Sequence, residues 1–350
     1  MKPKIEDLII KLLTERKLER FEYERLIEER DADSAERLRI EAEKIRKRYY
    51  GNTVYIRGLI EISNVCKNDC LYCGIRSSNK KCSRYRLSPE EIIGCCEEGY
   101  ALGFRTFVLQ GGEDPFYTDD ILCHIIKGIK SKFSDAAVTL SLGERSFESY
   151  AALKSAGADR YLLRHETADE NHYRKLHPQN MSFDNRIRCL LELKRLGYQV
   201  GCGFMVGSPY QSAFELSKDL KFIEEFEPHM CGIGPFIPQS DTPFGDRKAG
   251  TAELTYYLIS IIRLIHPNLL IPATTALGTI AENGRELGIL SGANVVMPNL
   301  SPSSVRSKYN LYNNKIYDGS ESAQCLEELK NRMNSIGYNV VVDRGDVKSI

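Results

Sequence analysis

From Val54 onward, short apolar runs alternate with longer stretches in which apolar residues recur every three or four positions. The short runs are rich in Val, Ile, Leu and Phe, which is typical of buried strands, and the longer stretches have the spacing of amphipathic helices. The predicted strands are Val54–Ile62, Arg105–Leu109, Ala137–Leu142, Arg160–Leu163, Gln199–Met205, Met230–Ile233, Leu269–Ala273 and Asn294–Met297. Eight such units predict an α/β fold, a (β/α)8 barrel of the TIM type. A doubly wound sheet is the alternative, and eight regular units fit it less well.

Several predicted helices have recognisable ends. Ser88, Pro89 and Glu91 form a capping box with proline in the first helical position, which predicts a helix over Pro89–Leu102. Three predicted helices are followed by a glycine, which favours a left-handed helix end: Gly103, Gly157 and Gly197.

Residues 1–50 have a different pattern. They contain no glycine, many charges of both signs and leucines at helical spacing, which predicts two or three amphipathic helices with a solvated charged face. The sequence after them has no low-complexity linker. We therefore expect an N-terminal helical extension over 1–50, the barrel over 51–315, and a helix and strand over 316–350 that complete or cap it.

The composition argues against several classes of partner. With 48 basic and 48 acidic residues the formal net charge is zero, so we expect no binding to nucleic acid or to an anionic membrane. The first residues lack the features of a secretory signal, and Gly, Pro, Ser and Asn interrupt the longest uncharged runs. We expect a soluble, cytoplasmic protein.

Three of the eleven cysteines form the sharpest motif of the sequence. Cys66, Cys70 and Cys73 lie directly after the first predicted strand, within eight residues. Three thiolates at this spacing can bind three irons of one [4Fe–4S] cluster and leave the fourth iron open. A structural zinc ion is the alternative, but it prefers four protein ligands, and the fourth would have to come from a distant part of the chain. The other cysteines fit buried strand and helix patterns and have no assigned role.

The triplet after a barrel's first strand resembles the signature of the radical S-adenosylmethionine (SAM) enzymes. Other stretches resemble one family among them, the HydE family of [FeFe]-hydrogenase maturases, which is related to biotin synthase and methylornithine synthase. These stretches are Tyr55–Cys66, Val108–Pro115, Tyr161–Thr167, Gly232–Pro238 and Pro272–Ala276. Together they are more specific than the cysteines alone.

One of these stretches ends the second predicted strand with Gln110, Gly111, Gly112 and Glu113. The glycines let the backbone approach a ligand, and the carbonyls and the carboxylate can accept hydrogen bonds from an ammonium group. A plain strand-to-helix turn is the alternative. The resemblance implies that Gly111, Gly112 and Glu113 receive the amino group of SAM, and it implies four more cofactor contacts: Tyr72, Ser141, Glu166 and Arg186.

Arg164, His165 and Glu166 end the fourth predicted strand, where (β/α)8 enzymes keep their sites. Glu166 can accept hydrogen bonds from ribose hydroxyls, and Arg186 can bind a carboxylate with two N–H groups. The alternatives are a structural ion pair between Arg164 and Glu166 and a surface ion pair for Arg186. We expect His165 to be packed or exposed, and not catalytic.

The remaining residues at the strand ends are polar and uncharged. Hydroxyls around Arg164 would form a pocket for a small anion or carboxylate, which suits an amino-acid-like ligand. The resemblance implies a substrate cavity lined by Gln110, Thr139, Arg164, Thr274, Thr275, Met297, Tyr309 and Tyr312. Ordinary barrel packing explains any single one of these residues about as well.

The resemblance also implies the chemistry. The cofactors are one [4Fe–4S] cluster and SAM, an external reductant supplies one electron, and SAM is cleaved to a 5′-deoxyadenosyl radical, with no catalytic residue beyond the cluster and that radical. The implied substrate is a small iron–carbonyl–cyanide complex of cysteine. Another hydrogenase maturase delivers it, for assembly of the di-iron subcluster of [FeFe]-hydrogenase.

This chain departs from many HydE sequences in one respect. They carry a second cysteine triplet near the C-terminus, whereas only Cys325 lies there in this sequence, so we predict no second cluster. Two other functions stay open: a different radical SAM activity, such as a methylornithine-synthase-like rearrangement, and an electron-transfer or metal-sensing protein. The open iron argues against the latter, because electron carriers normally bind all four irons.

Overall fold

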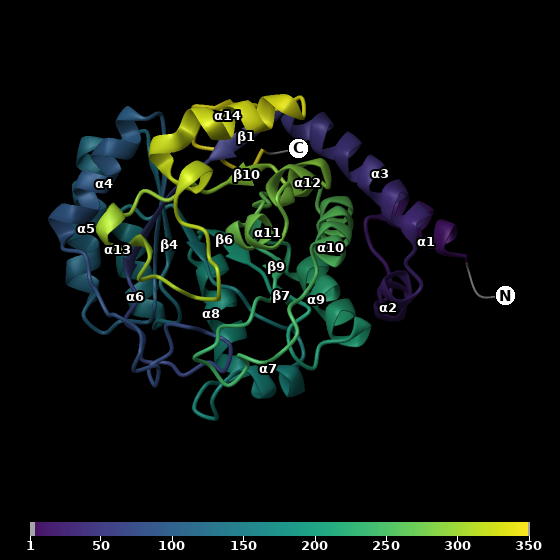
Figure 1. Cartoon of the computed structure of the whole chain (residues 1–350), viewed down its shortest axis with the longest axis horizontal. Helices are drawn as coiled ribbons and strands as arrows, with labels where there is room; N and C mark the ends of the chain where they lie inside the picture. The colour runs from purple at the N-terminus through teal and green to yellow at the C-terminus, as the bar shows by residue number, and fades with distance from the viewer. Residues whose placement is uncertain (1–3, 349–350) are drawn as a thin grey trace.

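The computed structural model describes residues 4–348, and it contains the predicted barrel (Figure 1). The predicted terminal parts include residues 1–3 and 349–350, which lie outside the described residues. The strands are β1 (Thr53–Ile56), β2 (Gly58–Ser63), β3 (Thr106–Gly111), β4 (Ala137–Ser141), β5 (Arg160–Leu162), β6 (Gln199–Cys202), β7 (Met205–Val206), β8 (Met230–Cys231), β9 (Gly234–Pro235), β10 (Val295–Val296) and β11 (Asn339–Val341). The helices are α1 (Ile5–Glu15), α2 (Arg20–Glu28), α3 (Ala32–Tyr50), α4 (Pro89–Ala101), α5 (Asp119–Lys132), α6 (Phe147–Ser155), α7 (Glu170–Leu176), α8 (Phe183–Arg195), α9 (Ala213–Phe226), α10 (Ala252–Ile265), α11 (Thr275–Ile280), α12 (Gly284–Leu290), α13 (Ser303–Arg306) and α14 (Leu326–Ser335), with 3₁₀ turns η1 (Gly319–Glu321) and η2 (Ala323–Cys325).

Parallel strands form the barrel wall. One sheet has the order β2-β3-β4-β5-β6-β8, and a second has the order β10-β1-β11. Single parallel bridges, Met230 with Leu270 and Pro272 with Val295, connect the two sheets on one side, and β1 leads into β2 on the other. The wall is therefore closed, and the carboxyl ends of its strands share one rim.

Two of the predicted strands are interrupted where glycines face each other. Gln199–Met205 is divided into β6 and β7, and Met230–Ile233 into β8 and β9. A Cβ atom on Gly203 would lie 2.1 Å from the carbonyl oxygen of Gly232, so the backbones approach more closely here than a regular ladder allows. Continuous strands were the wrong prediction at this point.

The seventh predicted strand, Leu269–Ala273, keeps only its two single bridges. Pro272 has no N–H group to donate, so a ladder cannot continue through it. The first predicted strand, Val54–Ile62, is divided at Arg57 into β1 and β2, which pair with different neighbours.

The predicted helix ends are confirmed. Ser88 caps α4 by accepting from the Glu91 N–H, and the Glu91 carboxylate accepts from the Ser88 N–H at 2.7 Å. The three exit glycines all have a positive φ: Gly103 (98°), Gly157 (115°) and Gly197 (74°). These turns return the chain to the next strand and thereby fix where that strand begins, at the end of the barrel opposite the rim.

The N-terminal helices pack against one side of the barrel (Figure 1). α2 contacts α9, and α3 contacts α10 through buried residues that include Leu38 and Ala42. Tyr257 on α10 donates to the carbonyl of Leu26 at 2.6 Å. Among residues 4–348, we find no helix that is long and apolar enough to cross a membrane.

The C-terminal segment closes the other end of the barrel. β11 pairs with β1, and Asp346 accepts from Arg160 (2.6 Å) and from Gln199 (3.0 Å), the first residues of β5 and β6. Thr106, the first residue of β3, donates to the carbonyl of Arg344 at 2.7 Å. The amino ends of three strands are therefore tied to one segment, opposite the rim.

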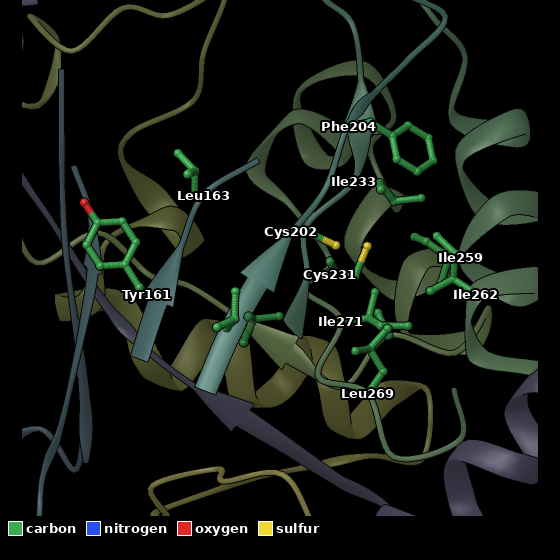
Figure 2. Close-up of a cluster of buried hydrophobic side chains, with 14 of the residues drawn as sticks. Tyr161, Leu163, Cys202, Phe204, Cys231, Ile233, Ile259, Ile262, Leu269 and Ile271 are labelled. Atoms are coloured by element: carbon green, nitrogen blue, oxygen red, sulfur yellow. The ribbon is translucent and has the colours of Figure 1, made fainter. Parts of the chain in front are cut away.

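Between the barrel wall and α10 lies an apolar core (Figure 2). Figure 2 shows the sulfur atoms of Cys202 and Cys231 side by side, on the side of Ile259 and Ile262. Both cysteines are free and fully buried. They occupy positions of small apolar residues, and they point away from the interior of the barrel.

Candidate functional site

The carboxyl rim of the barrel surrounds a cavity of about 360 Å³. All but one of the predicted site residues line it: Cys66, Cys70, Tyr72, Cys73, Gln110, Gly111, Gly112, Glu113, Ser141, Arg164, Glu166, Arg186, Thr274, Thr275, Met297, Tyr309 and Tyr312. Thr139 is the exception. It lies on β4 two residues before Ser141, which puts it on the same face of the strand but deeper in the wall.

Two guanidinium groups hold the cysteine loop in shape. Arg84 donates to the carbonyls of Ile75 (2.8 Å) and Arg76 (2.6 Å), and Arg76 donates to Asp69 at 2.8 Å. Loop carbonyls away from water need such donors. The two arginines therefore fix the path of the loop and, with it, the positions of the three cysteines.

The three thiols stay protonated and neutral unless a cation binds them. Burial raises the pKa of Cys66, raises that of Cys73 to about 12 and raises that of Cys70 well above its ordinary value, and the neighbouring Cys73 adds to the effect on Cys70. Thiolates form in such surroundings when a bound metal compensates their charge.

The number and the kind of the ligands fit a cluster. In the part of the chain that the structure describes, no three His, Cys, Asp or Glu side chains are grouped closely enough to bind one metal ion. Three cysteines can bind one iron each of a [4Fe–4S] cluster. The residues present therefore fit a cluster with one iron left for another ligand.

Gly112 lies against the cysteine loop. A Cβ atom there would lie 2.3 Å from the carbonyl oxygen of Val65 and 2.7 Å from the Cβ of Cys66. The sequence predicted that this glycine lets the backbone approach a ligand. In the structure, the missing side chain also lets the cysteine loop pack directly against Gly112.

Glu113 connects three parts of the rim. Its Oε1 accepts from the N–H of Glu144 at 3.0 Å, and its Oε2 pairs with Lys67 of the cysteine loop at 3.1 Å. A second hollow of about 420 Å³, whose lining includes Lys67 and Arg145, lies on the outer side of this carboxylate. Glu113 is thus part of the wall between the cavity and the protein surface.

Arg186 projects from the first turn of α8 into the cavity wall and is almost completely buried. Its Nε donates to Glu144 and its Nη1 to the carbonyl of Arg164, both at 2.6 Å. Burial opposes the charge of Arg186, but Tyr173 and Glu144 hold its pKa above the ordinary value. The guanidinium is a permanent positive charge at this rim.

Arg164 and Glu166 carry buried polar atoms with unused capacity. The Nη2 of Arg164 and the Oε2 of Glu166 are 3.3 Å apart, but within residues 4–348 neither atom, nor the Nε of Arg164, has a hydrogen bond. Buried polar groups in native proteins are normally paired. A polar ligand in the cavity would complete this part of the wall.

The hydroxyls divide into two kinds. Among the described residues, the Oγ1 atoms of Thr139 and Thr274 are buried and without a hydrogen-bond partner. The Oγ1 of Thr275, in contrast, donates to Glu321 at 3.0 Å and accepts from Arg285 at 3.2 Å. Gln110 donates to the hydroxyl of Tyr309 at 3.4 Å, and this hydrogen bond links β3 to the segment that contains Tyr309.

A buried ion pair at the cavity was missed by the sequence reasoning. Glu61 on β2 is fully buried, accepts from Lys315 at 2.5 Å and from Asn299 at 2.9 Å, and both charged residues line the cavity. A charge inside the predicted strand Val54–Ile62 was the available signal.

His177 is a second residue that the sequence did not single out. It is buried behind the cysteine loop and contacts the hydroxyl of Tyr72 at 3.2 Å. Burial and the nearby Arg186 lower the pKa of His177 to about 3, so the ring is neutral. These two residues are 105 positions apart, and no spacing rule connects them.

The chain is similar to known proteins over most of its length. The family model of the radical SAM superfamily matches residues 60–223. The chain is 47% identical over 309 residues to the [FeFe] hydrogenase maturase subunit HydE of Thermotoga maritima, which covers 88% of each protein. It is 33% identical over 279 residues to 3-methylornithine synthase of Methanosarcina barkeri, covering 78% of this chain and 77% of that one.

A solved structure with the same fold is the crystal structure of methylornithine synthase (PylB). It superimposes with a TM-score of 0.83 at 28% identity and covers 95% of this chain and 97% of its own. The barrel and the helices at its ends are therefore shared by proteins of different specificity, and the residues at the rim must distinguish them.

Proposed function

Because the chain belongs to the HydE family within the radical SAM superfamily, we propose that it acts in the maturation of [FeFe]-hydrogenase. The observation that carries this function is the 47% identity to a HydE protein across 88% of both chains. The 33% identity to 3-methylornithine synthase supports the superfamily but favours the rearrangement activity less.

The family implies a [4Fe–4S] cluster and SAM, and we propose which residues hold them. Cys66, Cys70 and Cys73 would bind three irons of the cluster. The chemistry that the bound pair supplies is one-electron cleavage of the SAM sulfonium to a 5′-deoxyadenosyl radical. Cys325 stands alone in its part of the sequence, which supports a single cluster.

The rim residues would orient SAM by its charged and polar groups. Arg186 offers a permanent positive charge to the methionine carboxylate, and the free oxygen of Glu166 offers an acceptor for ribose hydroxyls. The segment of Gly111, Gly112 and Glu113 offers backbone carbonyls to the amino group, with Tyr72 and Ser141 beside them. These roles are proposals that rest on the resemblance and on the positions of the residues.

The deeper cavity would take the substrate. Arg164 and Thr274 leave hydrogen-bonding atoms unused at the cavity, a pair that suits a small anion or a carboxylate, and Thr139 leaves its hydroxyl unused deeper in the wall. Thr275, Met297, Tyr309 and Tyr312 complete the wall. We propose that the substrate is an iron–carbonyl–cyanide complex of cysteine that another maturase supplies. We also propose that an external reductant supplies one electron and that the protein acts in the cytoplasm.

Enclosure is the contribution of the whole barrel. The segment that carries Tyr309 and Lys315 covers the rim, and the pair of Lys315 with Glu61 ties it to β2. A reactive radical in such a cavity meets few water molecules and few alternative partners. In this scheme the protein side chains orient SAM and the substrate and exclude water, and they donate no proton.

Two experiments test the function. The anaerobically reconstituted protein, given dithionite and SAM, should form 5′-deoxyadenosine, and its absence with four irons bound would remove the enzyme assignment. In a defined maturation system, active [FeFe]-hydrogenase should form only when this chain is present. Equal maturation without it, or formation of 3-methylornithine by it, would favour the rearrangement activity instead.

A further inference from the structure

His177 is joined to the cysteine loop by a side-chain hydrogen bond. Tyr72 lies between Cys70 and Cys73 in the sequence. Its hydroxyl is 3.2 Å from the Nε2 of His177. The two rings meet edge to face, with centroids 5.6 Å apart and planes at 88°. This geometry leaves the tyrosine ring little freedom to rotate.

The partners of the histidine decide which atom donates. Nδ1 lies 3.0 Å from the carbonyl oxygen of Tyr173, and a carbonyl only accepts, so Nδ1 carries the proton. In the neutral ring Nε2 is then an acceptor, and the hydroxyl of Tyr72 donates to it. The helix α7, which contains Tyr173, thus fixes the tautomer that the tyrosine requires.

The same turn of chain supports the cysteine loop at two more points. The N–H of Leu71 donates to the carbonyl of Leu176, the residue before His177, at 3.0 Å. The sulfur atoms of Cys70 and Met181 are 3.7 Å apart. Leu176 also packs in a small apolar cluster with Leu71 and Tyr72. The residues after α7 are therefore the back wall of the loop.

Through Tyr173 the contact continues to the predicted carboxylate site. The rings of His177 and Tyr173 are stacked, with centroids 3.9 Å apart and planes at 22°. The guanidinium of Arg186 lies 5.9 Å from the centroid of the Tyr173 ring. A continuous series of side chains thus connects Tyr72 to Arg186, two of the predicted SAM contacts on different elements.

We propose that His177 is a positioning residue that holds the ring of Tyr72 in the orientation in which it contacts SAM. The inference rests on the proposed function, since it requires that Tyr72 lines a SAM site. His177 does not line the cavity and acts through Tyr72. The proposal thus gives a role to a residue that binds neither the cluster nor SAM.

The test is a double-mutant cycle on the reconstituted protein. Tyr72→Phe removes only the hydroxyl, and His177→Phe keeps an aromatic ring but removes the acceptor. Each change should weaken SAM binding, measured by calorimetry, about fivefold, which corresponds to one neutral hydrogen bond. The double variant should also bind about fivefold more weakly, because both changes remove the same interaction.

A control separates positioning from general stability. His266 is partly buried, and its Nε2 contacts the carbonyl of Ile223 at 2.8 Å on the outer helices, so His266→Phe should lower stability without a change in SAM affinity. Electron paramagnetic resonance gives a second readout: the reduced clusters of unchanged protein and of His177→Phe should have the same spectrum alone and different spectra with SAM.

Clear results would overturn the inference. Unchanged SAM affinity in both single variants, or losses that multiply in the double variant, would mean that His177 does not act through Tyr72. If His177→Phe does not fold, the SAM affinity of Tyr72→Phe decides, because this variant loses only one oxygen atom and should fold. Unchanged protein that fails to bind SAM would instead refute the proposed function.

Discussion

Single residues at the rim combine strain with unused polar atoms. Glu166 has a φ of 66°, which is uncommon for a residue with a side chain, and its N–H donates to the carbonyl of Gly203 at 3.0 Å. His165 points to the opposite side, is fully buried and lies 3.3 Å from Asp219 on α9. The backbone is therefore held from outside the barrel while Arg164 and Glu166 face the cavity. Strain kept at such a point is typical of functional residues.

Replacing Glu166 should separate stability from binding. Glycine adopts a positive φ without strain, whereas glutamine keeps the strain, so we expect Glu166→Gly to be more stable than Glu166→Gln by about 1 kcal/mol. Both variants lose the carboxylate and should bind SAM less tightly than the unchanged protein. Thermal unfolding of the cluster-free protein and calorimetry measure the two effects. Equal stability of the two variants would mean that the backbone at this position is not strained.

At the scale of elements, the pattern of the sequence predicted most of the fold. The capping box at Ser88 and the exit glycines depend on neighbouring residues, and they were predicted correctly. The reduction of Leu269–Ala273 to single bridges could have been expected from Pro272. The breaks near Gly203 and Gly232 could not, because they arise from two backbones that meet across the barrel wall.

The candidate site was predictable where residues lie at strand ends. The cysteine loop, the Gly111–Gly112 turn and the Arg164–Glu166 triplet follow strands directly, so closure of the barrel brings them to one rim. The contact of Tyr72 with His177 and that of Glu61 with Lys315 join distant parts of the chain. Such pairs depend on how helices and rim segments pack, which local patterns do not encode.

The close contact between β3 and the cysteine loop leads to a prediction for Gly112. A methyl group there would collide with Val65 and Cys66, so Gly112→Ala should displace the loop and reduce the iron bound after reconstitution to less than half. The barrel core is distant from this contact, and the circular dichroism spectrum should be unchanged. Gly94 in α4 has open space around its Cβ position, so Gly94→Ala should bind iron normally. Full iron content in Gly112→Ala would contradict this account of the glycine.

At the scale of the whole molecule, the C-terminal segment is a structural part of the barrel. Burial of Asp346 acts to raise its pKa, but the hydrogen bond and charge of Arg160 dominate and hold the pKa well below its ordinary value. Arg160 itself is fully buried. One carboxylate thus neutralises a charge at the closed end of the barrel and joins β5 and β6 to the end of the chain.

The stability that Asp346 contributes should depend on pH. A carboxyl group whose pKa is depressed in the folded state stabilises it above the pKa of the unfolded chain, about 3.9, and this contribution is lost as the pH falls below that value. The difference in unfolding free energy between unchanged protein and Asp346→Asn should be largest near pH 6 and should shrink as the pH falls below about 4. Urea unfolding of the cluster-free protein measures it, with Asp246→Asn, at an exposed position, as the control. A difference that stays constant with pH would contradict the assignment.

The pairing of β1 with β10 and β11 has a consequence for biosynthesis. The three cysteines leave the ribosome early, but β10 and β11, which complete the wall, are synthesised much later, so the cavity cannot form before these strands have emerged. Until then the nascent protein presents three thiols that oxygen and unspecific metal ions can reach. We therefore expect low oxygen during translation to increase the amount of protein that can later bind a cluster.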